Sequence, residues 1–82
     1  MPLFLGFHNM GQAVTDEEMK GIFEKYQAAA EAHGAKAHKV YYNGEAGRAF
    51  CVTEADSAAD VDAAHADVGK PTDELIEVQK LK

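Results

Sequence analysis

The chain contains one cysteine, two prolines and no tryptophan among its 82 residues. A single cysteine excludes an internal disulfide, and it disfavours a structural zinc site, since the usual sets need at least two thiolates from one chain. Basic side chains are also few: eight lysines and arginines face fourteen acidic residues, for a formal net charge of −6. No basic run is present to follow phosphates, so nucleic acid is not an expected partner.

Long hydrophobic runs are absent too. No apolar segment approaches the roughly 20 residues that span a bilayer, so the sequence predicts no membrane partner. The N-terminal segment 1–8 lacks the basic region and the apolar length of a signal peptide. Together with the single cysteine, these absences predict a reduced, cytoplasmic protein. The length allows one domain over residues 1–82 with a single two-layer core.

Hydrophobic periodicity and turn signals divide the chain into six elements. Thr15-Asp-Glu-Glu18 has the form of a capping box and Ser57 is a second helix cap, while Gly34 and Gly69 are typical of helix ends. The elements are strand, helix, strand, strand, helix and strand, over 3–8, 15–33, 37–42, 48–54, 57–68 and 74–81. This order predicts an α+β, ferredoxin-like βαββαβ fold, with a four-stranded antiparallel sheet and both helices on one face.

The hairpin between the two middle strands determines which side chains share a face of the sheet. A turn centred near Glu45 places Val40 opposite Phe50 and His38 opposite Val52, and directly opposed residues share a face. We therefore expect one face to carry His38, Val40, Phe50, Val52 and Glu54, and the other to carry Tyr41, Ala49, Cys51 and Thr53. The second face is the one that the two helices leave open, and it also carries Phe4, Leu75 and Leu81. It is too apolar to be exposed to water, which predicts a homodimer through this open face of the sheet.

Candidate metal ligands gather in the second half of the chain. Cys51, Glu54 and His65 supply thiolate, carboxylate and imidazole, each of which donates a lone pair to a borderline transition metal. A histidine on the apolar face of a helix is by itself more often a partly buried, hydrogen-bonded residue than a ligand. His65 shares that face with Val61, Ala64 and Val68, so it is turned toward the sheet, and the register above adds His38 and Glu54 to the same layer.

Strand alternation argues against one compact site that contains both Cys51 and His38, because it places them on opposite faces. Either a bulge or the strand end breaks the alternation, or there are two positions, one inside each subunit and one at the dimer interface. His8, at the end of the first strand, is a candidate ligand for the second position. A lone Cys51 in a strand is otherwise a small hydrophobic residue. His33 beside Gly34 is interpreted as a favourable charge at a helix C-terminus.

These segments together resemble a family of small bacterial proteins long catalogued as a domain of unknown function, of which some members bind nickel. The resemblance covers nearly the whole chain and rests on the Met-Pro-Leu-Phe-Leu start, the strand end at 50–55, His65, and the closing segment 69–78. It implies a dimeric ferredoxin-like fold and nickel held by histidine, cysteine and carboxylate side chains. It also implies Cys51, Glu54 and His65 as ligands, whereas His38 and His8 are added by the face argument.

These observations predict a protein that binds or sequesters a divalent transition metal, most of all nickel, without catalysis. The alternative is a small dimeric α+β barrel enzyme that uses Cys51 with a nearby histidine in a cavity between the sheets. A third interpretation is a dimerising module without a small ligand. The reactivity of Cys51 separates the first two, because nickel protects a ligand thiol from alkylation and leaves a catalytic thiol reactive.

Overall fold

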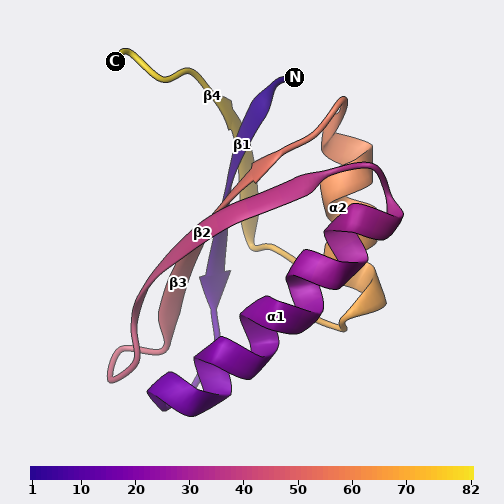
Figure 1. The fold of residues 1–82 in the computed structure, drawn as a ribbon. Coiled ribbons are helices and arrows are strands. Elements are labelled where there is room, and N and C mark those ends of the chain that lie inside the picture. Colours follow the sequence, from indigo (N-terminus) through magenta and orange to yellow (C-terminus); the bar gives the residue numbers. More distant parts are fainter.

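The computed structural model describes all residues from 1 to 82, and its elements follow the predicted order. They are β1 (Leu3–Asn9), α1 (Asp16–Ala32), β2 (Lys36–Asn43), β3 (Arg48–Glu54), α2 (Ala58–Asp67) and β4 (Glu74–Val78). All strands pair antiparallel in the sheet order β2-β3-β1-β4, and both helices lie on one side of the sheet (Figure 1). The predicted ferredoxin-like βαββαβ fold is confirmed.

Both helices begin at the predicted caps. The Thr15 hydroxyl accepts the Glu18 N–H, and the Glu18 carboxylate accepts the Thr15 N–H, which completes the capping box. The Ser57 hydroxyl accepts the Asp60 N–H. Neither helix has the length and apolar character that crossing a bilayer requires. The last strand is shorter than predicted, since it ends at Val78 and the C-terminal residues extend away from the body (Figure 1).

The predicted hairpin register is wrong by one residue near the turn. Val40 pairs with Cys51 and Lys39 with Val52, because the hairpin closes at Asn43 and Arg48 around the four residues 44–47. The Asn43 side chain accepts the Ala46 N–H within this loop. The register then shifts between Ala37 and Lys39, which makes His38 an extra residue in a β-bulge.

The two faces of β3 are also exchanged relative to the prediction, whereas Val40 and Tyr41 of β2 lie on the predicted helix side and open side. The helix side carries small buried residues of β3, namely Ala49, Cys51 and Thr53, whereas Phe50 and Val52 face away from the helices. Small side chains on this side fit helices that pack close to the sheet, and α1 and α2 likewise bury Ala30 and Ala64 there. The buried core consists of Phe4, Tyr26, Ala30, Ala35, Ala37, Cys51, Ala55, Val61 and Ala64, with Leu75 packed against it.

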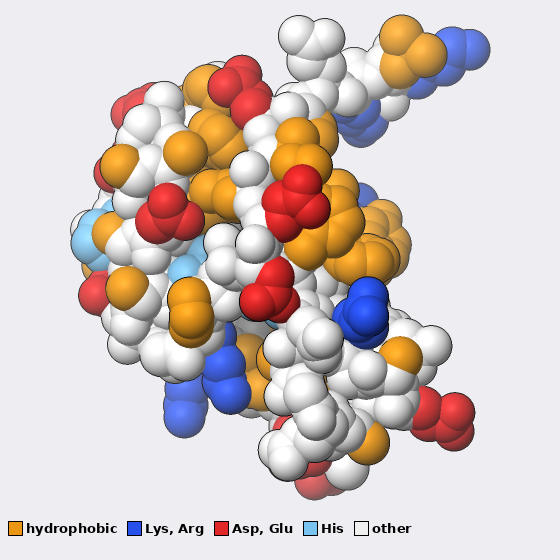
Figure 2. Space-filling model, turned by 180° about the vertical axis from the view of Figure 1, so that it is seen from behind, with side chains coloured by type: hydrophobic (Ala, Val, Ile, Leu, Met, Phe, Trp, Pro, Cys, Tyr) orange, Lys and Arg blue, Asp and Glu red, His pale blue; other side chains and the backbone are white.

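The open face of the sheet is apolar but differs in membership from the predicted one. Tyr41, Phe50 and Ile76 are 58%, 39% and 41% exposed, and Phe50 packs edge-on against Phe7 with ring centroids 5.0 Å apart. Phe4, Ala49, Cys51 and Leu75 belong instead to the helix side. From behind, hydrophobic side chains lie among acidic ones near the projecting C-terminal residues (Figure 2). The homodimer through this face stays a prediction.

Candidate metal centre

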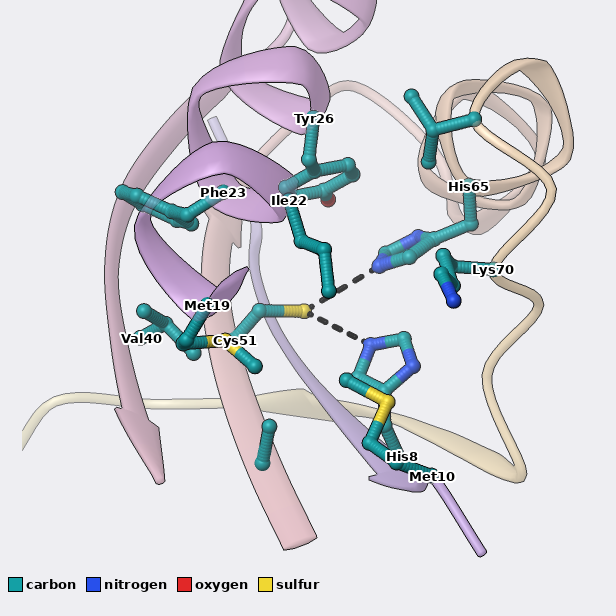
Figure 3. A pocket seen from close by; sticks show the side chains of 12 residues that line it. His8, Met10, Met19, Ile22, Phe23, Tyr26, Val40, Cys51, His65 and Lys70 are labelled. Carbon is teal, nitrogen blue, oxygen red and sulfur yellow. Dashed lines mark hydrogen bonds between the residues drawn. The ribbon is translucent and has the colours of Figure 1, made fainter. Parts of the chain in front are cut away.

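Three donor side chains from three different elements meet on the helix side of the sheet. His8 lies near the end of β1, Cys51 in the middle of β3, and His65 in the last turn of α2. The Cys51 Sγ lies 3.3 Å from His65 Nε2 and 3.6 Å from His8 Nε2, and the three donor atoms lie within 4.8 Å of one another (Figure 3). Their exposed fractions are only 9%, 3% and 2% in chain order.

Strand alternation brings His8 and Cys51 to the same side. Phe4, Gly6 and His8 point toward the helices from β1, and Gly6 lies directly opposite Cys51 on β3. A Cβ atom on Gly6 would stand 2.9 Å from the Cys51 sulfur and 3.0 Å from the methyl group of Thr72. The absence of a side chain at Gly6 therefore leaves the space that the thiol occupies.

His65 is oriented by its own helix and by an aromatic neighbour. Its Nδ1–H donates to the carbonyl oxygen of Val61, one turn earlier, at 2.8 Å. A carbonyl only accepts, so Nδ1 carries the proton and Nε2 presents a lone pair toward Cys51. The ring of Tyr26 lies over the imidazole with centroids 4.1 Å apart, and the Tyr26 hydroxyl is hydrogen-bonded to that of Thr53 at 2.5 Å.

Burial controls the protonation of all three donors. Desolvation, helped by the proximity of His65, lowers the pKa of His8 to about 4, against the opposing effects of a hydrogen bond to the Pro71 backbone and of Asp73. Desolvation also lowers the pKa of His65 and raises the pKa of Cys51. At neutral pH the site therefore holds two neutral imidazoles, which are ready to bind a metal, and one thiol that must lose a proton.

The separations between donor atoms suit a single small ion. Metal–sulfur bonds of about 2.3 Å and metal–nitrogen bonds of about 2.05 Å, at a tetrahedral angle, place sulfur and nitrogen about 3.6 Å apart. The two sulfur–nitrogen distances here, 3.3 Å and 3.6 Å, lie close to that value. The two sulfur–nitrogen separations therefore fit a transition metal, and the imidazole nitrogens, within 4.8 Å of each other, would have to approach to about 3.3 Å to bind the same ion.

The structure separates the other two predicted ligands from this cluster. His38 and Glu54 lie on the open face, where His38 Nε2 and Glu54 Oε1 are 2.6 Å apart. This contact lowers the pKa of the Glu54 carboxyl. The expectation that His65 shares a layer with His38 and Glu54 is wrong, because it rested on the incorrect face assignment. His8, expected at a separate position, lies beside His65 instead.

Several neighbours of the cluster carried no recognised signal in the sequence. Met10, Met19 and Ile22 line a cavity of about 30 Å³ together with the three donors (Figure 3). Met10 follows His8 by two residues but lies in a loop without periodicity, while the sequence indicated Met19 only as part of the apolar face of a helix.

His33, predicted to be no ligand, lies outside the cluster. Its Nε2 atom is 2.7 Å from the Asp67 carboxylate, and this contact joins the ends of the two helices.

Comparison with known proteins gives one family and one solved structure. The family model described as nickel responsive protein SCO4226-like matches residues 4–78. The crystal structure of SCO4226 from Streptomyces coelicolor A3(2) is similar with a TM-score of 0.90 and 20% identity, over 98% of this chain and 99% of that one. At this identity the structural likeness shows the fold alone. A search of curated proteins found no match.

Proposed function

The chain belongs to the nickel-responsive SCO4226-like family, and from this premise we propose that it binds and sequesters a divalent transition metal, nickel first, without catalysis. His8, Cys51 and His65 are the proposed ligands. Glu54 and His38 are left out of the set because they face the other side of the sheet. Mixed nitrogen and sulfur sites hold nickel strongly, and selectivity then depends on geometry and on which metals the cell supplies.

The convergence of three donor atoms in a buried site is the observation that supports this proposal most. Each imidazole presents Nε2 to the same sulfur, although the three residues are separated by 43 and 14 positions in the chain. Burying two histidines that stay neutral removes the proton competition that an exposed histidine would offer a metal near pH 6. The dependence on a free thiol fits a reducing compartment such as the cytoplasm.

The enzyme alternative is less well supported. Catalytic thiols are partly exposed and have a lowered pKa, because the thiolate is the nucleophile. Cys51 is 3% exposed, and burial raises its pKa. It also faces the helices and so cannot line a cavity between two sheets packed face to face, where the alternative placed it.

We also propose that a second copy covers the open face of the sheet. The aromatic and aliphatic side chains exposed there form one side of a two-layer protein that has no third layer (Figures 1 and 2). Pairing two such faces buries both sets from water and satisfies twofold symmetry. Since all three proposed ligands come from the helix side, each subunit holds its own metal.

Calorimetric titration of chelator-stripped protein with nickel tests the metal site. We expect one ion per chain in the wild type, and loss of saturable binding in Cys51→Ser and in His65→Ala. His38→Ala is the matched control, because it removes an imidazole from the open face and is expected to bind nickel as the wild type does. Saturable binding that persists in Cys51→Ser, or a folded wild type that binds no metal, would contradict the proposal.

A further inference from the structure

The cavity beside the three donors offers sulfur and no carboxylate. Met10 and Met19 both line it, and the only lining side chain with a permanent charge is the ammonium of Lys70. Figure 3 shows Met10 against the His8 ring and Met19 on the Cys51 side. The Met10 backbone N–H donates to the Gly47 carbonyl at 2.7 Å, which holds this residue beside the site. The two thioethers are therefore the soft donors that the lining adds, since the Tyr26 hydroxyl, which also lines the cavity, is a harder oxygen donor already hydrogen-bonded to Thr53.

Charge balance in the site favours a monovalent ion. The bound form has one thiolate and two neutral imidazoles, so a monovalent cation makes the site neutral and a divalent cation leaves one net positive charge. An unpaired charge in apolar surroundings is costly, and Lys70 adds a repulsion of the same sign. No acidic side chain lines the cavity, although the carboxylates of Asp73 and Asp62, which lie outside it, favour positive charge at His8 and His65.

We propose that the cluster of His8, Cys51 and His65 is also a cuprous-ion site that holds Cu(I) more tightly than Ni(II), with the thioether of Met10 or Met19 as a further ligand. Thiolate and thioether are soft donors that select Cu(I), whereas the imidazoles of the site suit nickel and copper alike. Cys51 is the chain's only cysteine and is buried, so no second thiol competes for the ion or forms an internal disulfide. This inference rests on the proposed function, because it uses the same three donors.

Competition under anaerobic conditions tests the inference. Metal-free protein is titrated with a Cu(I) salt in the presence of a chromophoric Cu(I) chelator, and separately with nickel in the calorimeter. We expect one Cu(I) per chain, bound about 100-fold more tightly than nickel. Met10→Leu or Met19→Leu is expected to weaken Cu(I) binding about tenfold and to weaken nickel binding much less, since leucine keeps the volume and removes the sulfur. Ile22→Leu, which alters the same cavity without touching a sulfur atom, is the control for packing.

Lys70→Glu tests the charge argument at an exposed position where folding is not at risk. This change is expected to reduce the ratio of the Cu(I) affinity to the nickel affinity about threefold, because it adds an acidic group near the divalent ion. Lys25→Glu makes the same charge change on the exposed surface of α1 and is expected to leave the preference unchanged. Circular dichroism of each variant establishes that the fold is retained.

The outcomes separate this inference from the proposed function. Saturable nickel binding without Cu(I) binding, or with weaker Cu(I) binding, overturns the inference and leaves the nickel site standing. Absence of both overturns both proposals. Cu(I) affinity that is unchanged in a Met10→Leu, Met19→Leu double variant overturns the thioether ligand.

Discussion

Each face of the sheet has histidine beside a partner side chain, but the histidines of the two faces differ in burial. On the helix side, His8 and His65 are buried, and their pKa values are lowered, so they are neutral and their Nε2 atoms face a thiol. On the open side, His38 lies at the surface against the Glu54 carboxylate. Residue type alone does not make a metal ligand. Burial decides whether an imidazole keeps its lone pair for a metal or serves as a surface partner for an acid.

The largest expected effect is the pH dependence of nickel binding on the helix side, where binding releases a proton. Since both buried imidazoles are neutral at pH 7 and above and burial raises the pKa of the Cys51 thiol, nickel binding between pH 8 and 7 is expected to displace one proton per ion. Lower pH favours the thiol, so nickel affinity is expected to fall about tenfold over this pH unit. Titrations in buffers of different ionisation enthalpy count the proton. Release of two or three protons per ion would show that the histidines are charged before binding.

A charge on the open face is expected to weaken the proposed dimer and to leave nickel binding unchanged. Ile76 is 41% exposed on β4 and lies opposite Leu5 on that face. Ile76→Asp places a carboxylate in the proposed interface and is expected to raise the dimer dissociation constant about 30-fold, equivalent to about 2 kcal/mol. Analytical ultracentrifugation measures this change. An unaltered mass distribution would argue against the interface, and lost nickel binding would argue that the ligands depend on the second copy.

Filling the space opposite the thiol is expected to disturb the helix side. Gly6→Ala would place a methyl group 2.9 Å from the Cys51 sulfur, so the sulfur or the strand must shift. We expect the free energy of unfolding to fall by about 1–2 kcal/mol and nickel affinity to fall about tenfold. Chemical denaturation and calorimetry measure the two effects. Gly21→Ala is the control, because a Cβ atom there meets no neighbour within 4 Å.

Removing the tyrosine hydroxyl above the site is expected to have a smaller effect. Tyr26→Phe keeps the ring that covers His65 and removes the buried hydrogen bond to Thr53. The loss is expected to lower the free energy of unfolding by about 1 kcal/mol, with nickel affinity reduced less than fivefold. Thr53→Val removes the other partner of the same bond. If the double variant lost the sum of the two single effects, the hydrogen bond would not couple the two residues.

Replacing the surface histidine His38 is expected to have the smallest effect on stability and on nickel affinity. His38→Ala removes the contact with Glu54, and the pKa of that carboxyl should return toward its ordinary value. Exposed ion pairs contribute little to folding, so the thermal midpoint should not change measurably. His33→Ala breaks a similar pair with Asp67 and is the comparison. A large loss of stability or of nickel affinity in His38→Ala would contradict the separation of the two faces.

The order of elements was predictable because each boundary has a local cause. Thr15 and Ser57 satisfy free N–H groups at the helix starts, and Gly34 and Gly69 adopt the positive φ that follows the helix ends. His65 could be placed toward the sheet for the same reason, since its neighbours at helical spacing are apolar.

The assignment of residues to faces could not be predicted in this way. A shift of one residue in the turn changes the partner of every β2 residue from Lys39 to Asn43, and no glycine or proline marks the bulge at His38 where the shift ends. β1 and β3 have apolar residues on both faces, so their patterns allow either one to meet the helices. The meeting of His8, Cys51 and His65 depends on that choice, and so these three donors could be named individually but not grouped.

The wide separation of the three donors along the chain would also link binding of the proposed metal to the lifetime of the protein. An unfolded chain does not bring positions 8, 51 and 65 together, so a bound ion stabilises the native state as a whole, by about 2.7 kcal/mol at a free concentration 100 times the dissociation constant. Cellular proteases act mainly on transiently unfolded chains. Chains without metal would be degraded sooner than loaded ones, and the amount of this protein would rise with the supply of the ion it holds.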